Sequence, residues 1–175
     1  MNDDQCQAAA PPPGGVLPIE MFAAALPKGA RLIGIDVGTK SLGLALSDVS
    51  RMIASALETI RRTKFKVDGA RLLEIASGHG VGGFVIGLPL NLDGTEGPRS
   101  QATRAFARNL AALTPLPIAF WDERLTTAEA ERMLIEADAT RRRRAEVIDK
   151  LAATLILQGA LDRMREAELG HRPRA

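Results

Sequence analysis

The chain has 175 residues, 46% hydrophobic and 25% charged, which is enough to bury the core of one soluble domain. A net charge of +2 does not by itself indicate a nucleic-acid binder, and one cysteine with two histidines leaves too few ligands for disulfides or for a thiolate or multi-histidine metal site. No apolar run approaches the ~20 residues of a membrane span, and the acidic, proline-rich N-terminus is unlike a signal peptide, so we expect a cytoplasmic protein without a membrane partner.

The chain is expected to form one folded domain with two tails. Residues 1–29 are predicted as a flexible extension, because they begin with an acidic and then proline-rich stretch. Residues 170–175 are predicted as a disordered tail, and residues 30–169 would form the domain between them. Within the extension, residues 16–26 are expected to form a short element that packs on the edge of the domain.

The first part of the domain predicts three strands. Residues 31–36 are apolar and β-branched, as in a buried strand, and residues 41–48 alternate large and small side chains with a period of two. Only four residues join these two segments, so we expect them to pair as an antiparallel hairpin. Residues 53–60 are predicted as the third strand.

The remainder alternates between helices and strands. The expected elements are a helix over 67–80, a strand over 82–90, a helix over 100–113, a strand over 116–123, a helix that starts at a capping box formed by Thr126 and Glu129, and a last helix over 145–167. Strands that alternate with helices indicate the α/β class. We therefore expect a mixed five-stranded sheet, three strands in an antiparallel hairpin arrangement and the others parallel, flanked by helices.

Three acidic residues are predicted to face the protein rather than water. Asp36 ends the first strand in the alternation phase of Leu32 and Gly34, so its side chain belongs to a face of the sheet. Glu123 ends the last strand. Asp149 heads the small, apolar face of the last helix, which contains Ala152, Ala153, Ile156 and Ala160. Each acid alone has a structural explanation: a turn for Asp36, an arginine partner for Glu123, and the helix macrodipole for Asp149.

Convergence of the three acids would require a compensating cation. Burial of like charges is expensive without one, and carboxylate oxygens favour the hard ions Mg²⁺ or Mn²⁺. Two such ions about 3.5–4 Å apart can activate water and stabilise a leaving oxygen in phosphodiester hydrolysis. If the acids converge, the sequence therefore predicts this chemistry.

Four sequence blocks resemble, in order, the motifs of the YqgF family. They are GIDVGTKSLGLALSD, VIGLPLNLDGTEGPRS, WDERLTTAEAE and IDKLAATLILQGALD, and the resemblance covers residues 31–163. Members of that family are described as Holliday-junction-resolvase-like proteins and as pre-16S ribosomal RNA nucleases with a ribonuclease-H-like fold. The resemblance implies that this chain is a metal-dependent endonuclease in which Asp36 bridges two ions and Glu123 and Asp149 complete their shell.

The resemblance also implies residues that bind the substrate. Asn91 lies in the LPLNLDG loop, which would lie near the strand ends that carry the acids, and Lys40 and Arg124 are candidate phosphate contacts. The family's first motif often has arginine after this lysine, whereas this chain has Ser41. That difference removes one candidate phosphate contact next to Lys40.

The composition bears on the type of substrate. Five phenylalanines, one tryptophan and no tyrosine disfavour recognition of splayed bases on an aromatic platform. Contacts to the backbone through arginine fit better. The expected partners are nucleic acids, namely structured RNA or branched DNA, with ribosome-assembly intermediates and a homodimer as further candidates.

Two other classes of function stay open at this stage. The GIDVGTKS stretch also resembles the first phosphate-binding motif of sugar kinases and actin-like ATPases, in which backbone N–H groups cradle nucleotide phosphates. Those proteins place two such domains around the nucleotide, whereas 175 residues supply one. The second alternative is a binding module for nucleic acid that keeps the fold and has lost catalysis.

A run of four arginines next to Asp149 generates the first prediction. Arg141, Arg142, Arg143 and Arg144 would either form a solvated face or guide phosphates toward the acids. If they contact phosphates, replacing all four with glutamine will weaken nucleic-acid binding and reduce the slope of log affinity against log salt concentration. Titrations at several salt concentrations measure both quantities, and an unchanged affinity with an unchanged slope would contradict the phosphate role.

Overall fold

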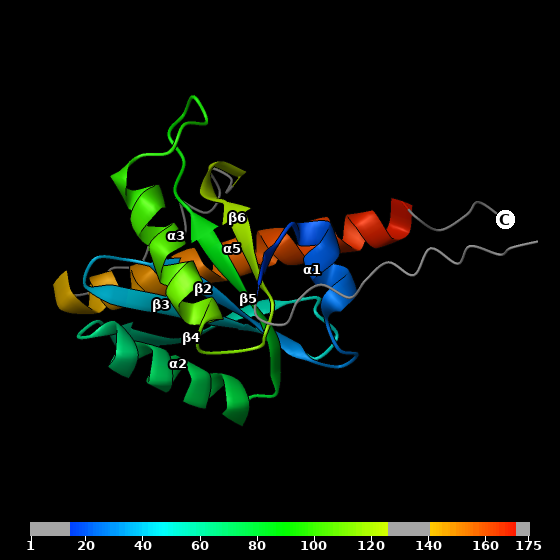
Figure 1. Ribbon diagram of the computed structural model, residues 1–175, viewed down its shortest axis with the longest axis horizontal. Coiled ribbons are helices and arrows are strands. Elements are labelled where there is room, and N and C mark those ends of the chain that lie inside the picture. The colour runs from blue at the N-terminus through cyan, green and yellow to red at the C-terminus, as the bar shows by residue number, and fades with distance from the viewer. Residues whose placement is uncertain (1–14, 126–140, 171–175) are drawn as a thin grey trace, which may run out of the picture.

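A computed structural model describes residues 15–125 and 141–170, with the side chains of residues 141–147 left out (Figure 1). Six strands form one sheet in the order β1-β6-β5-β2-β3-β4. The elements are β1 (Val16–Leu17), α1 (Ile19–Ala25), β2 (Arg31–Val37), β3 (Ser41–Ser47), β4 (Ala54–Arg61), α2 (Phe65–Gly78), β5 (Val81–Leu88), α3 (Pro98–Ala111), β6 (Ile118–Asp122), the short 3₁₀ helix η1 (Glu123–Leu125) and α5 (Arg141–Gly170).

The sheet has the mixed antiparallel and parallel arrangement that the sequence predicts. Strands β2, β3 and β4 pair antiparallel, and β5 and β6 continue the sheet parallel to β2. The expected number of five strands is wrong by one. The described sheet has a sixth strand, β1, which pairs with the edge of β6 through only two residues. A pairing that short has no periodicity by which the sequence would reveal it.

The segment before β2 is packed against the domain. Phe22 of α1 is completely buried and Leu26 nearly so, and both belong to the core between the sheet and α5. The second half of the predicted flexible extension is therefore part of the fold, in agreement with the edge element expected at 16–26. Residues 1–14 and 171–175, which include most of the predicted tails, lie outside the described residues, as does the helix expected from Thr126.

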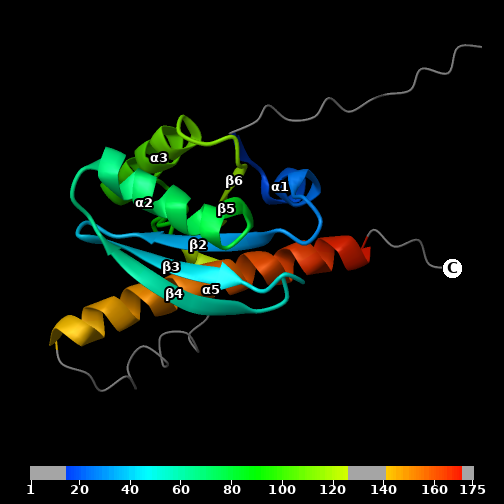
Figure 2. The same cartoon turned by 90° about the horizontal axis from the view of Figure 1, so that it is seen from below.

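The sheet separates two hydrophobic cores. Helices α2 and α3 cover one face, and α5 crosses the other (Figure 2). In β2, Ile33 and Ile35 belong to the core under α2 and α3, whereas Leu32 belongs to the core under α5. Asp36 shares the phase of Leu32, so it lies on the α5 face.

Glycines allow α5 to lie directly on the sheet. A Cβ atom on Gly34 would lie 2.6 Å from Leu157 Cβ, and one on Gly43 would lie 2.1 Å from the backbone oxygen of Asp149. On α5, the residues that face the sheet, Ala153, Ile156, Leu157 and Ala160, are buried. The small, apolar helix face predicted around Asp149 is thus confirmed, although Ala152 is only half-buried.

Among the helices within 15–125 and 141–170, none combines the length and apolar character that crossing a bilayer demands.

The contact between α5 and β3 generates the second prediction. Gly43→Ala places a methyl group against the backbone of α5, which cannot move aside without shifting the whole helix, so we expect the free energy of unfolding to fall by about 1–3 kcal/mol. Urea denaturation measures this change. Gly78→Ala at the end of α2 is the control, because a Cβ there meets no atom within 4 Å, and we expect it to leave stability unchanged or slightly higher. Equal effects of the two substitutions would contradict the close approach.

Candidate functional site

Three carboxylates converge at one edge of the sheet. Strands β2, β5 and β6 are parallel, so their C-terminal ends meet at this edge. Asp36 is the penultimate residue of β2, and Glu123 follows β6 directly. Asp149 approaches from α5, whose backbone at this residue lies against Gly43 of β3. The convergence on which the sequence-based prediction depends is met only in part, because the three acids lie at the same edge but form no group that could hold one ion within the described residues.

Electrostatic interactions link the three acids through Asp36. Burial raises the pKa of Asp36 to about 6, the negative charge of Asp149 adds to this rise, and the positive charge of Arg99 opposes it. The pKa of Glu123 is also raised, first by burial and then by the charge of Asp36, again opposed by Arg99. Asp36 thus interacts with both other acids and is the centre of the cluster.

A hydrogen bond orients Asp149. The hydroxyl of Ser41, the first residue of β3, donates to Asp149 Oδ2 at 2.5 Å. Ser41 stands at the position where the family's motif often has arginine. The departure from the motif therefore has a structural role in this chain: in place of a candidate phosphate contact, it holds one of the carboxylates.

Glu123 lies against a glycine of the neighbouring strand. A Cβ atom on Gly87 of β5 would lie 2.7 Å from Glu123 Oε1 and 2.4 Å from Ile156 Cδ1 of α5. A larger residue at this position would displace either the carboxylate or the helix. The absence of a side chain on Gly87 leaves the space in which Glu123 sits beneath α5.

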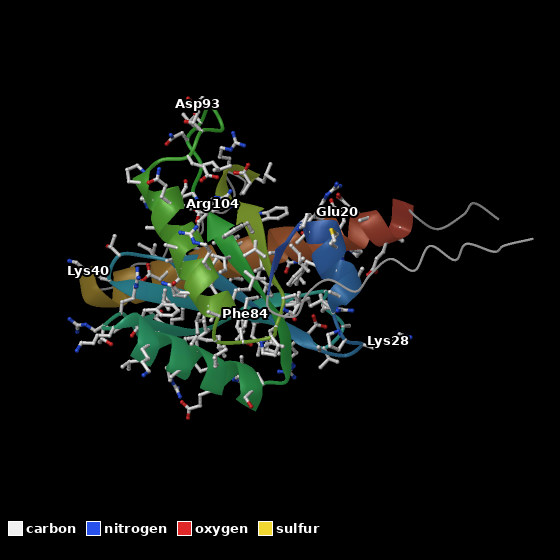
Figure 3. All side chains as sticks on the ribbon, in the orientation of Figure 1. Glu20, Lys28, Lys40, Phe84, Asp93 and Arg104 are labelled. Atoms are coloured by element: carbon white, nitrogen blue, oxygen red, sulfur yellow. The ribbon has the colours of Figure 1, made fainter. Side chains whose placement is uncertain are left out.

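The turn between β2 and β3 is closed by backbone hydrogen bonds. The N–H of Gly38 donates to the carbonyl of Ser41 at 2.9 Å, and Arg62 donates from its side chain to the carbonyl of Gly38 at 2.6 Å. The N–H of Gly38 is therefore already used within the hairpin. Lys40 is exposed at the tip of this turn (Figure 3).

The side chains of Asn91 and Arg124 make contacts within the protein. The Asn91 amide donates to Thr95 Oγ1 at 2.8 Å inside the loop that follows β5. Arg124 pairs with Asp122 at 2.6 Å and donates to the carbonyl of Leu92 at 3.4 Å. Both residues thus shape the loop next to the acids. The side chains of Arg141, Arg142, Arg143 and Arg144 lie outside the described residues, although the backbone there begins α5.

Sequence reasoning missed Arg99. This exposed residue lies in the first turn of α3, directly after Pro98, and its charge lowers the pKa values of both Asp36 and Glu123. One feature of the sequence could have identified this arginine. It follows a proline in the block GTEGPRS, at the start of a helix, where a positive charge is unfavourable for the helix macrodipole. A basic residue at that position therefore indicates an interaction of the cation with groups outside the helix.

The donor set fits divalent metal ions. Buried carboxylates whose pKa values are raised, as those of Asp36 and Glu123 are, are suited to hard cations, which would compensate their negative charge. Within the described part of the chain, however, no three acidic, histidine or cysteine side chains are grouped so that they could hold one ion together.

Comparison with known proteins matches the chain to one family over most of its length. The family model described as "RuvX: Holliday junction resolvase" matches residues 30–163. A protein of Ruegeria sp. (strain TM1040) is 62% identical over 146 residues, or 83% of this chain and 93% of the relative. A protein of Bradyrhizobium sp. (strain BTAi1 / ATCC BAA-1182) is 59% identical over 152 residues, or 87% and 94%. Both are named "Putative pre-16S rRNA nuclease".

Among solved structures, that of Thermus thermophilus RuvC is 18% identical to this chain, with a TM-score of 0.49. The match covers 78% of this chain and 97% of that one.

The raised pKa of Asp36 generates the third prediction. In the absence of metal, native Asp36 keeps its proton up to about pH 6, whereas the unfolded chain releases it near pH 4. The native state therefore binds more protons between these values, and the free energy of unfolding falls as the pH rises through this window. Asp36→Asn removes the ionisable group and therefore this pH dependence. We expect the free energy of unfolding of the variant to exceed that of the wild type by about 1–3 kcal/mol at pH 7.5 in EDTA, and by less at pH 4.5.

Urea denaturation at the two pH values measures this difference. Asp48→Asn is a control of opposite sign, because hydrogen bonds from Ser50 and from the backbone of Ile53 lower the pKa of Asp48 to about 2. Asp48 contributes stability that is present above pH 4 and is lost as the pH falls toward 2, so its variant should be less stable at pH 7.5. An Asp36→Asn protein that is also less stable than the wild type at pH 7.5 would contradict the proposed burial of charge.

Proposed function

The chain belongs to the RuvX family, and on this premise we propose that it is a divalent-metal-dependent endonuclease that processes the 5′ end of pre-16S ribosomal RNA in the cytoplasm. The observation that carries the proposal is the convergence of Asp36, Glu123 and Asp149 at one edge of the sheet, with raised pKa values for the first two. The relatives' names, which specify a pre-16S rRNA nuclease, support the choice of substrate.

Asp36 would contact two Mg²⁺ or Mn²⁺ ions, with Glu123 and Asp149 each completing one side. Such ions stabilise the charge that develops on a phosphate and its leaving oxygen, and they lower the pKa of water. Ser41 keeps Asp149 in one orientation through its hydrogen bond, so that this carboxylate is in place before the substrate arrives.

Positive side chains around the acids would bind the sugar-phosphate backbone. Arg99 lies close enough to lower the pKa values of two of the acids, and Lys40 is exposed at the tip of the adjoining turn. Because a phosphodiester is an anion, these cations would draw it toward the carboxylates, which would otherwise repel it. Arg124 would act indirectly, since it pairs with Asp122 and fixes the neighbouring loop.

Branched DNA is the second candidate substrate, and the description of the matching family as a Holliday junction resolvase favours it. Both substrates present phosphates along a helical backbone, so the carboxylate site would cleave either by the same chemistry. Direct comparison decides between them: an RNA that spans the 5′ end of the 16S sequence, a four-way DNA junction and an unstructured RNA, each incubated with Mg²⁺ or Mn²⁺. Nucleotide binding, measured in parallel, tests the kinase-like alternative.

The fourth prediction concerns the central carboxylate. Asp36→Asn keeps the shape of the side chain and removes its charge, so we expect kcat for the preferred substrate to fall about 10³-fold, which corresponds to a loss of several kcal/mol of charge stabilisation. Circular dichroism should show a folded protein. The matched control is Asp162→Asn, a half-buried acid in the second half of α5 that pairs with Arg165, and it should retain full activity.

Wild-type cleavage that persists in EDTA, or Asp36→Asn with full activity, would contradict the proposed function. Tight binding of nucleic acid without cleavage in either metal would instead support the non-catalytic binding module.

A further inference from the structure

A hydrophobic residue is exposed at the tip of the loop between β5 and α3. This loop, residues 89–97, projects from the edge of the sheet that carries the carboxylates (Figure 1). Leu92 is 97% exposed, the largest exposed fraction among the large hydrophobic residues of the described chain. The loop does not fold this side chain back onto the domain, although burial of a leucine would stabilise the protein by roughly 1.5–3 kcal/mol.

The loop holds its tip by a dense set of internal hydrogen bonds. The backbone N–H of Asn91 donates to the carbonyl of Thr95 at 2.9 Å, and the N–H of Gly94 donates to the carbonyl of Asn91 at 2.8 Å. Gly94 has a φ of +86°, a left-handed conformation that glycine adopts without strain. An isolated bridge between Leu90 and Glu96 closes the base of the loop. The exposed leucine therefore sits on an ordered support.

The tip lies next to the proposed catalytic acids. Arg124, the residue after Glu123, donates to the carbonyl of Leu92 at 3.4 Å. Leu92 is only four positions after Leu88, which pairs with Asp122 at the end of the sheet, and four steps along the chain span at most about 14 Å. A nucleic acid with its scissile phosphate at the carboxylates would therefore pass within a few nucleotides of the leucine.

The charges around the tip do not suit a phosphate contact. Asp93 lies beside Leu92 at the end of the loop (Figure 3), and hydrogen bonds from Thr95 lower the pKa of its carboxyl group, so it is ionised at neutral pH. Glu96 is also negative and is paired with Arg104 at 2.5 Å. The charge of Glu96 is thus largely balanced by Arg104, and that of Arg124, which contacts the Leu92 carbonyl, is balanced by Asp122. Asp93 beside the leucine would repel the backbone, whereas the faces of the bases are apolar and uncharged.

We propose that Leu92 is a wedge that inserts between stacked bases of a structured nucleic acid beside the cleavage point. The proposal rests on the proposed nuclease function and adds how that site selects its substrate. Apolar side chains, leucine among them, enter base steps in proteins that bend or open a duplex. An apolar residue that disrupts stacking would let a protein with few aromatic residues recognise a junction or the end of a helix.

Fluorescence of 2-aminopurine tests the wedge without cleavage. The base analogue is placed at successive positions near the expected cleavage point of a structured RNA and, in a separate arm, of a four-way DNA junction. Asp36→Asn protein should raise the fluorescence at one or two adjacent positions as stacking is lost, and the Asp36→Asn, Leu92→Ser double variant should lose most of this rise. The arm that shows the rise identifies the nucleic acid that the wedge opens.

Cleavage rates give the second measurement. Leu92→Ser should lower kcat/KM for the structured substrate about tenfold or more, as expected from losing the burial of one leucine, whereas Leu92→Met should retain most of it. On a substrate with an unpaired base already at that position, Leu92→Ser should be nearly as active as the wild type. Ile53→Ser is the matched control, because Ile53 is 63% exposed and precedes β4 at the opposite end of the sheet.

The outcomes separate this proposal from the proposed function. A wild type that does not cleave but shows Leu92-dependent fluorescence would overturn the nuclease and support the wedge. Cleavage and a fluorescence rise that are both unaffected by Leu92→Ser would overturn the wedge alone. Absence of any fluorescence change with the Asp36→Asn protein would overturn it as well.

Discussion

The site depends on how closely α5 lies on the sheet. Gly34 and Gly43 remove side chains from β2 and β3 along the path of the helix, so that backbone and Cβ atoms of α5 lie directly against the strands. This close approach brings Asp149 within hydrogen-bonding distance of Ser41 and into the field of Asp36. Because a helix is rigid along its axis, a shift anywhere along this contact moves the carboxylate. The packing of α5 on the sheet therefore also determines where Asp149 lies relative to Asp36.

The contact between α5 and the sheet also brings negative charges close together, which lowers the stability of the fold when no cation compensates them. Burial raises the pKa values of Asp36 and Glu123, the charge of Asp149 adds to the first and that of Asp36 to the second, and Arg99 compensates only part of this effect. A hydrophobic cluster at the same edge would be more stable, and the acids are kept at the expense of that stability. Binding of divalent cations would reverse the sign of the local field. If the proposed function holds, metal binding would contribute both to catalysis and to the stability of the folded protein.

Regular periodicities in the sequence were enough to predict on which faces of the sheet and of the last helix the acids lie. A period of two placed Asp36 on the same sheet face as Leu32, and a period of 3.6 placed Asp149 on the helix face that packs there. Contacts between residues distant in sequence were not predictable. Ser41 bonds a residue 108 positions away, β1 pairs with the distant β6, and Arg99 acts from a different helix, and no local pattern in the sequence encodes such partners.

Anomalous scattering from crystals of the wild type grown with Mn²⁺ tests the proposal that two divalent ions share Asp36. We expect two Mn²⁺ peaks at the carboxyl edge of the sheet, both in contact with Asp36, one also with Glu123 and the other with Asp149. Peaks at other acidic residues with none at Asp36, or a single ion bound without it, would contradict this proposal.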